Sequence, residues 1–226
     1  MRLDGKIVLI TGATGGLGQA VTPAFVKAGA TIAVVGRQGP ENGIDASLAV
    51  AGDVTDEGDV RRTVAEVLGK TGRIDCLVNL VGAFAPGRIT DTELSVWQKM
   101  LSLNATSAFL LSKAVAAHMV EQGAGRIIHI AARAALDPFS GAGAYIVAKS
   151  AMVALIKVLA LEVGDSGVTV NGVLPTTIDT PANRTSMPTA DFNRWVKPES
   201  IAQLLVFLAS EETGAINGAL IPIGSP

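Results

Sequence analysis

Tyr145 and Lys149 stand four residues apart at the start of a long apolar stretch. On a helix, side chains at this spacing lie on one face and can meet. The phenol of tyrosine has a pKa of about 10 in water, and a neighbouring ammonium favours its ionised form. The pair therefore predicts a proton donor that works near neutral pH, with Lys149 lowering the pKa of the phenol. The alternative is an ordinary amphipathic helix, and the other motifs of the chain favour the chemical interpretation.

A glycine-rich turn follows the apolar run 7–10, where the pattern of a strand gives way to that of a helix. This is where the pyrophosphate of a dinucleotide binds in a doubly wound fold, because the unpaired N–H groups of the helix N-terminus point at the phosphates. Small residues let the chain turn and let the backbone approach the ligand. The expected dinucleotide contacts are Gly12, Thr14, Gly15, Gly16, Leu17 and Gly18.

The second apolar run ends at Gly36 and is followed by Arg37. NAD-binding units usually place an acid here, against the ribose hydroxyls. A guanidinium instead can receive a 2′-phosphate, so the sequence predicts NADP(H) rather than NAD(H). A solvated surface arginine is the alternative. Asp53, after the third apolar run, could accept a hydrogen bond from the adenine amine or could cap the next helix.

Short apolar runs that alternate with helical patterns must position these residues. They indicate a parallel sheet covered on both faces, with right-handed crossovers. We predict one α/β domain over 1–226, a doubly wound (Rossmann) parallel sheet of about seven strands flanked by helices. The expected strands are 7–10, 31–35, 48–51, 76–78, 127–130, 168–174 and 220–223, and the expected helices are 18–28, 56–70, 93–103, 104–122, 144–163 and 198–209.

Composition narrows the classes of partner. The 226 residues are 49% hydrophobic and 17% charged with a formal net charge of -2, and no basic run suggests nucleic acid. The start of the chain lacks a signal-peptide pattern, and no uninterrupted apolar run approaches the roughly 18 residues of a membrane helix. The lone Cys76 lies in an apolar run and is expected in the core of a cytoplasmic protein. The high apolar fraction suggests an oligomer.

Taken together, these motifs resemble the short-chain dehydrogenase/reductase family over nearly the whole chain. Residues 11–18 are similar to its cofactor loop, and Asp53 with Val54 to its adenine-contact pair. The stretch from Asn79 to Gly82 resembles a divergent form of its Asn-Asn-Ala-Gly motif. The resemblance implies that these residues contact the cofactor.

The catalytic part of the chain carries the same resemblance. Tyr145 and Lys149 form the family's Tyr-x-x-x-Lys signature, and Asn104 falls at its helix-kink asparagine. The stretch 175–180 is similar to Pro-Gly-x-Val-x-Thr, with Thr176 in place of glycine.

Roles follow from that resemblance. Lys149 would bind the nicotinamide ribose, and Asn104 would hold a water that links Lys149 to solvent. Thr180 and the backbone of Ile178 would hold the carboxamide, and Pro175 and Thr177 complete the expected cofactor contacts. A homodimer or homotetramer would pair the apolar faces of 104–122 and 144–163.

One departure concerns the substrate. The family normally has a serine thirteen residues before the tyrosine, bonded to the substrate carbonyl, and here that residue is Ala132, preceded by Ala131. Losing one such donor costs about 3 kcal/mol in the transition state. Either Arg133 or Thr177 stands in for it, or the substrate needs less polarisation.

The second explanation agrees with a resemblance to the dihydropteridine reductase branch over 131–137 and 177–195. That branch also lacks the serine, because its quinonoid dihydropterin is electron-poor and needs only a hydride and one proton. The segment 181–195 would close over the substrate. Arg37 and Asn104 differ from the branch, which often uses NADH. The expected substrate contacts are Phe84, Ala132, Arg133, Asn183 and Met187.

Three functions stay open: an NADP(H)-dependent reductase of the dihydropteridine reductase type, a carbonyl or 3-oxoacyl reductase, and a catalytically weak NADP(H)-binding protein. His118 and His129 have no cysteine or carboxylate at metal-ligand spacing, so no metal site is expected. Trp97 and Phe109 are expected to pack rather than to bind cofactor.

Overall fold

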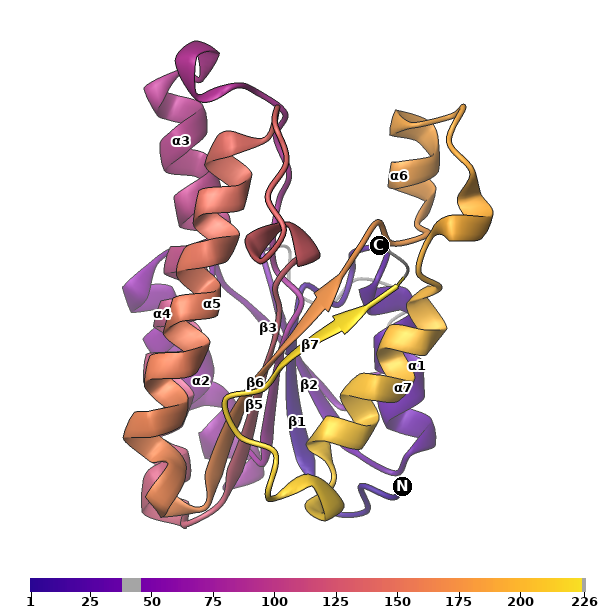
Figure 1. Ribbon diagram of the computed structural model, residues 1–226. Helices are drawn as coiled ribbons and strands as arrows, with labels where there is room; N and C mark the ends of the chain where they lie inside the picture. Colours follow the sequence, from indigo (N-terminus) through magenta and orange to yellow (C-terminus); the bar gives the residue numbers. More distant parts are fainter. Residues whose placement is uncertain (38–45, 225–226) are drawn as a thin grey trace.

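A single seven-stranded sheet forms the centre of the computed structural model, which describes residues 1–37 and 46–224 (Figure 1). Every neighbouring pair of strands is parallel. The polar loop expected after Arg37 lies largely outside the described residues. The strands, in the spatial order β3-β2-β1-β4-β5-β6-β7, are β1 (Ile7–Thr11), β2 (Thr31–Gly36), β3 (Leu48–Ala51), β4 (Cys76–Asn79), β5 (Gly125–Ile130), β6 (Val168–Pro175) and β7 (Leu220–Ile223).

Two layers of helices cover the sheet (Figure 1). α1 (Gly18–Lys27) and α7 (Pro198–Ala209) lie on one face, and α2 (Glu57–Thr71), α4 (Ser107–Gln122) and α5 (Gly143–Val163) lie on the other. Because side chains alternate along a strand, each strand feeds both layers. Leu9 belongs to the core under α4 and α5, whereas its neighbours Val8 and Ile10 belong to the core under α1 and α7. The predicted doubly wound fold is confirmed.

The order in which the chain adds strands to the sheet reverses between β1 and β4. The chain steps outward from β1 through β2 to β3 and then returns to pair β4 with the other side of β1, with Thr11 opposite Asn79. Ligands of such sheets bind in the crevice at the carboxyl ends of the strands where the order reverses. The sequence motifs at 11–18 and 79–82 therefore meet at one place.

The predicted helices 93–103 and 104–122 are one continuous helical segment. α3 (Leu94–Met100) runs through a π-helical turn, Leu101–Thr106, into α4. Asn104 explains the wide turn, because its Nδ2 donates to the carbonyl oxygens of Met100 (2.9 Å) and Ala83 (3.0 Å). By length and composition alone, Leu94–Gln122 could cross a membrane, with a mean hydropathy of 1.3, but 50% of that window is buried inside the protein.

Other element ends follow local chemistry. Asp56 caps α2 as predicted by accepting a hydrogen bond from the Asp59 N–H (2.8 Å). The helix continues one residue beyond the expected 56–70, to Thr71, and is followed by Gly72, whose φ of 74° suits a C-terminal glycine. Short helical elements that the sequence did not predict are α6 (Pro181–Ser186) and the single turns Ile89–Asp91, Arg133–Ala135, Gly164–Ser166, Phe192–Arg194 and Glu211–Thr213.

Candidate active site at the carboxyl edge of the sheet

The glycine-rich turn leaves β1 and enters α1 with almost no room for side chains. Gly12 has a φ of +75°, and a Cβ there would lie 3.1 Å from the backbone nitrogen of Val81. A Cβ on Gly18 would lie 2.2 Å from the carbonyl oxygen of Ala13, so only glycine lets α1 start against the turn. Gly15 and Gly16 are exposed, and their backbone is open to a ligand. The turn has the form expected of a phosphate-binding loop.

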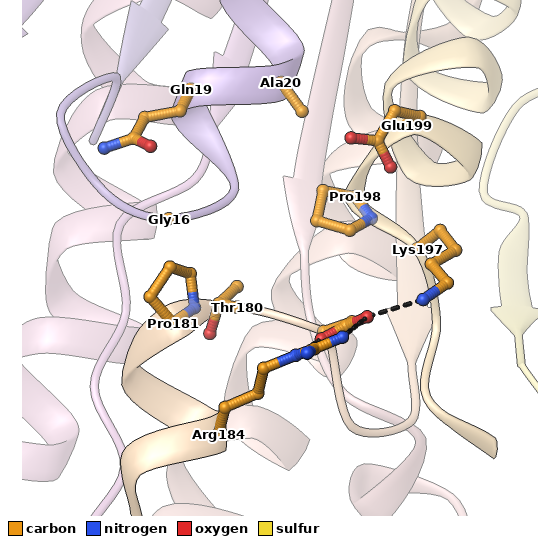
Figure 2. Close-up of a pocket in the computed structure, with 10 residues that line it drawn as sticks. Gly16, Gln19, Ala20, Thr180, Pro181, Arg184, Lys197, Pro198 and Glu199 are labelled. Carbon is orange, nitrogen blue, oxygen red and sulfur yellow. Dashed lines mark hydrogen bonds and ion pairs between the residues drawn. The ribbon is translucent and has the colours of Figure 1, made fainter. Parts of the chain in front are cut away.

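A cavity of about 680 Å³ opens beside this turn (Figure 2). Its size is within the range of small-ligand pockets. Tyr145 is not among its lining residues, so the cavity does not include the candidate proton donor. It is lined by Gly16, Gln19, Ala20, Asp179, Thr180, Pro181, Arg184, Lys197, Pro198 and Glu199.

Arg37 and Asp53 lie close together where β2 and β3 end. The Asp53 carboxylate accepts hydrogen bonds from the hydroxyl (2.7 Å) and the N–H (2.9 Å) of Thr55, and these bonds lower its pKa. The positive charge of Arg37 lowers the pKa further. Asp53 therefore shapes the loop before α2 and is not the cap of that helix. Val54 is buried, so its predicted contact with the adenine stays a prediction.

Burial controls the ionisation of Tyr145 and Lys149 on the first turns of α5. Lys149 is 4% exposed and donates from Nζ to the carbonyl oxygen of Ile130 (2.7 Å). Desolvation lowers the pKa of Lys149 to about 7 and raises the pKa of Tyr145 to about 12. The expectation that Lys149 lowers the phenol pKa is thus wrong for this structure, because desolvation dominates. At neutral pH Tyr145 keeps its proton, as a proton donor must.

Gly82 allows Asn104 and Lys149 to approach each other. A Cβ at Gly82 would lie 2.9 Å from Asn104 Oδ1 and 3.1 Å from Lys149 Nζ. Asn104 is fully buried and also accepts the Ala83 N–H at Oδ1 (3.2 Å). The structure thus brings together three residues that the sequence assigned to the site, while the water at Asn104 stays a prediction.

Asn79 lies beneath the cleft and not in it. Its side chain is fully buried, and Oδ1 accepts hydrogen bonds from the Thr11 hydroxyl (2.8 Å) and the Val81 N–H (3.1 Å). Its Nδ2 lies 3.2 Å from Nδ1 of His129. The predicted direct contact between Asn79 and the cofactor is therefore corrected to a supporting role, because the amide is already occupied.

The wall expected to polarise a carbonyl is apolar. Ala131 and Ala132 are buried and offer only methyl groups. Arg133, a predicted substitute for the missing serine, directs its Nε to the Asp137 carboxylate. The predicted contact Phe84 is 59% exposed, and its ring meets the Tyr145 ring edge-on with centroids 5.0 Å apart. An aromatic corner therefore stands beside the candidate proton donor.

The two ends of the segment 178–196 lie next to each other. Thr177 and Ile178 pair with Val196, which brings the two ends together. Asn183 donates from Nδ2 to the carbonyl oxygen of Ile178 (2.8 Å) and so braces the segment, and its contact with substrate stays a prediction. Met187 is 39% exposed at its outer part.

Sequence reasoning missed the charged cluster at the root of this segment. The carboxylate of Asp179 accepts from Arg184 Nε (2.6 Å) and Nη2 (2.9 Å) and from Lys197 Nζ (2.6 Å). The labelled side chains of Arg184 and Lys197 point toward each other in Figure 2. These bonds hold the pKa of Asp179 well below its usual range. Arg184 also lies over the ring of Phe192, 4.6 Å from its centroid. Lys197 is eighteen residues from Asp179, so no local pattern signalled the contact.

Thr180 lies between this cluster and the glycine-rich turn. Its hydroxyl accepts from the Asn183 N–H (3.3 Å), and its Cβ would lie 3.0 Å from a Cβ on Gly16. Pro175 ends β6, and the predicted stretch 175–180 reaches the turn at Thr180. Among residues 1–37 and 46–224, no group of three or more His, Cys, Asp or Glu is placed to hold a metal ion.

The comparisons with known proteins agree with this geometry. The family profile described as short chain dehydrogenase matches residues 6–191. The chain belongs to the short-chain dehydrogenase family. Its members are oxidoreductases that use NAD(P), so this protein is an oxidoreductase of that family.

Relatives within the family act on different substrates. D-threitol dehydrogenase of Mycolicibacterium smegmatis is 34% identical, with 96% of this chain and 91% of that protein covered. The 3-oxoacyl-acyl-carrier-protein reductase of Thermotoga maritima is 31% identical, with 99% and 98% covered. A short-chain type dehydrogenase/reductase from Mycobacterium ulcerans superposes with a TM-score of 0.91 at 27% identity, with 99% and 90% covered. An NAD⁺-bound xylitol dehydrogenase shares the fold, with a TM-score of 0.89 at 24% identity and 100% of both chains covered.

Proposed function

We propose that this short-chain dehydrogenase uses NADP(H) to reduce an electron-poor conjugated substrate of the quinonoid dihydropterin type. The observation that carries the proposal is the hydroxyl-free wall at Ala131 and Ala132, both buried. A conjugated acceptor disperses the charge that a hydride brings, so it does not need a hydroxyl to hold a developing oxyanion. The aromatic corner of Phe84 and Tyr145 suits a flat ring.

The residues have distinct tasks in this reaction. NADP(H), when bound, supplies the hydride. Tyr145, protonated at neutral pH because burial raises its pKa to about 12, donates the proton to the reduced ring. Lys149 and Asn104 meet at Gly82, where they would hold the ribose and a water. The segment 178–196 would close over the substrate and exclude solvent.

A second candidate function is reduction of a carbonyl or 3-oxoacyl group. It is favoured by the names of two relatives of this chain, a D-threitol dehydrogenase and a 3-oxoacyl-acyl-carrier-protein reductase. A third is a catalytically weak NADP(H)-binding protein. Steady-state NADPH oxidation with quinonoid dihydropterin beside a panel of ketones and a 3-oxoacyl thioester separates the three. We expect turnover with the pterin, loss of most of it in Tyr145→Phe, and unchanged NADPH binding in that variant.

Ala132→Ser is the matched test of the missing donor. Restoring one hydroxyl should raise ketone reduction by about 100-fold, the size of one oxyanion donor, and should leave pterin reduction nearly unchanged. Efficient ketone turnover by the wild type would select the second function. Tight NADPH binding without turnover of any substrate would select the third.

The preference for NADP(H) is proposed from Arg37, which is exposed at the end of β2 beside Asp53. Arg37→Ser should weaken NADPH binding by about tenfold or more, the value of a charge-assisted hydrogen bond, and should leave NADH binding unchanged. Fluorescence titration of both dinucleotides measures this. Equal affinities of the wild type for NADPH and NADH would contradict the proposal.

We also propose a cytoplasmic homodimer or homotetramer. The outer faces of α4 and α5 carry large exposed apolar side chains, and such faces usually contact another protein. They include Phe109 (47% exposed), Val147 (41%), Val158 (52%) and Leu161 (85%).

A further inference from the structure

His129 is a buried titratable group to which the proposed reaction gives no task. It lies on β5 with its ring fully buried, 3.2 Å from Asn79 Nδ2 at Nδ1 and 2.9 Å from the Ser112 hydroxyl at Nε2. A hydrophobic or small side chain would fill a sheet interior at lower cost than an imidazole. The presence of a hydrogen-bonded imidazole at this buried position therefore suggests a specific role for the ring.

The backbone N–H of Val81 determines the donor and the acceptor in each hydrogen bond between Asn79, His129 and Ser112. The Val81 N–H can only donate, so the atom of Asn79 that it meets at 3.1 Å is the amide oxygen. The amide nitrogen then faces His129, and because it carries only hydrogens, Nδ1 of His129 must accept. The ring proton consequently sits on Nε2 and is donated to Ser112 on α4.

The ring keeps this one form at physiological pH. Burial, with a smaller contribution from the charge of Lys149, lowers the pKa of His129 to about 3. Protonation of Nδ1 would set two donors against each other at Asn79. The direction of each hydrogen bond is therefore constant.

Asn79 in turn joins the end of β1 to the segment that follows β4, next to the glycine-rich turn. Its oxygen accepts from Thr11, the last residue of β1, and from Val81, just after β4. The backbone of Val81 packs against Gly12, the first glycine of the phosphate-binding turn. On the other side, Ile130 follows His129 on β5, and its carbonyl oxygen accepts from Lys149.

We propose that His129 is a positioning residue for the dinucleotide: its Nδ1 orients the Asn79 amide, which ties Val81, and with it the adjacent turn at Gly12, to the end of β1 in the position that the cofactor needs. This rests on the proposed function only in that the cleft takes NADP(H). His129 touches no reacting atom.

Two substitutions separate the two nitrogens of the ring. The amide of His129→Asn reaches the position of Nδ1 and can still accept from Asn79, whereas the amide of His129→Gln reaches the position of Nε2 and keeps Ser112 instead. Each variant loses one buried hydrogen bond, so the free energies of unfolding should fall by similar amounts. NADPH affinity should stay within about threefold of wild type in His129→Asn and weaken by about tenfold in His129→Gln, the loss of one buried hydrogen bond.

Equal affinities in the two variants, whether both normal or both weakened, would overturn the proposal. Ser112→Ala, which keeps the ring, should bind NADPH like the wild type, and weakened binding would also overturn it. Nitrogen-15 NMR of the wild-type imidazole should show one neutral tautomer with the proton on Nε2 from pH 6 to pH 9. A titrating ring or a proton on Nδ1 would contradict the proposal even if neither substituted chain folds.

The readout needs no substrate, which separates this inference from the reaction. Suppose that the wild type binds NADPH but reduces no pterin, and that NADPH affinity differs between His129→Asn and His129→Gln as expected. This result would remove the proposed substrate and support the role of His129. A wild-type protein that binds neither NADPH nor NADH would overturn both.

Discussion

At the scale of single residues, the candidate site depends on how deeply Lys149 is buried. An ammonium with 4% exposure loses most of its hydration, and it donates to the neutral carbonyl oxygen of Ile130 and not to a carboxylate among the described residues. Its charged form is therefore disfavoured until an anion or a ribose hydroxyl arrives. Tyr145 nearby stays protonated for the same reason. Lys149 thus binds its proton weakly while Tyr145 holds its proton firmly.

This burial predicts how stability depends on pH. The pKa of Lys149 is about 7 in the folded protein against an ordinary value of 10.5, so between these values the unfolded chain binds a proton that the folded chain does not. The free energy of unfolding should therefore rise from pH 7 to pH 10, as measured by urea denaturation of the cofactor-free protein. Lys149→Met should flatten this rise. Tyr145, with its pKa raised to about 12, acts in the opposite sense only above about pH 10.

Lys157→Met is the control, because Lys157 lies exposed on the same helix. Identical pH slopes in the wild type and in Lys149→Met would show that the buried ammonium is not the source.

The types and spacing of Tyr145 and Lys149 could be predicted from sequence, because a helix places residues four apart on one face. Their ionisation could not. It depends on how much water the fold removes around each group, and that follows from packing against β5 and the segment 79–85. The same limit applies to Asn183, whose amide bonds inside its own segment for reasons that only the folded loop reveals.

At the scale of elements, the segment 178–196 is held by ion pairs near its two ends and by contacts between aromatic rings within it. Asp179 joins Arg184 to Lys197, and Arg184 continues the stack onto Phe192 and then Trp195, whose ring lies 4.7 Å from that of Phe192. The segment is therefore one braced unit, and its base carries Ile178 and Thr180, the predicted cofactor contacts. The sequence suggested a covering loop here but not its bracing, because the partners are distant in the chain.

Asp179→Asn should loosen this unit. An amide cannot satisfy two cations, so Arg184 and Lys197 lose their common partner. Limited trypsin digestion should cut after Arg184 about tenfold faster, in proportion to the loss of a hydrogen bond to a charged group, whereas the Lys197–Pro198 bond resists trypsin in every variant. Saturating NADPH should restore much of the protection. Asp165→Asn, in an exposed turn after α5, should digest like the wild type. No change in the cleavage rate after Asp179→Asn would rule out the bracing role.

The π-helical turn at Leu101–Thr106 shows what an element-level pattern misses. The apolar periodicity of 93–122 predicted helix correctly, and Asn104 marked the irregularity. The sequence could not show that the helix continues through it, because the turn is stabilised by the backbone of Ala83 on another part of the chain.

At the scale of the whole molecule, the sheet order was predictable because alternating strands and helices admit few arrangements, and a switch point between the first and fourth strands is the common one. The outer surface was less predictable. Phe109 was expected to pack but is 47% exposed in the single chain, with Lys113 over its ring. In the proposed oligomer a second copy would cover this ring.

Leu161→Glu tests the proposed assembly. Leu161 is 85% exposed, so the single chain should lose no more than about 0.5 kcal/mol of stability. A carboxylate buried between two α5 helices would be strongly unfavourable, and analytical ultracentrifugation should show a shift toward monomer. Leu94→Glu, at another exposed leucine (67%) on α3, should leave the mass unchanged. A wild-type monomer, or an intact oligomer in Leu161→Glu, would contradict the proposed interface.

The sheet also separates two sets of substitutions. Side chains on one surface pack with α1, α7, Ile178 and Val196, which root the segment 178–196, while those on the other surface pack with α4 and α5. Adjacent positions such as Val8 and Leu9 belong to different sets. Variation in the segment 178–196 can therefore accumulate independently of variation on the outer faces of α4 and α5, and the free-energy effects of two changes on opposite sides of the sheet should sum when the positions lie more than about 7 Å apart. Proteins with this architecture can therefore change the residues around the substrate without changing the helix faces proposed to join subunits.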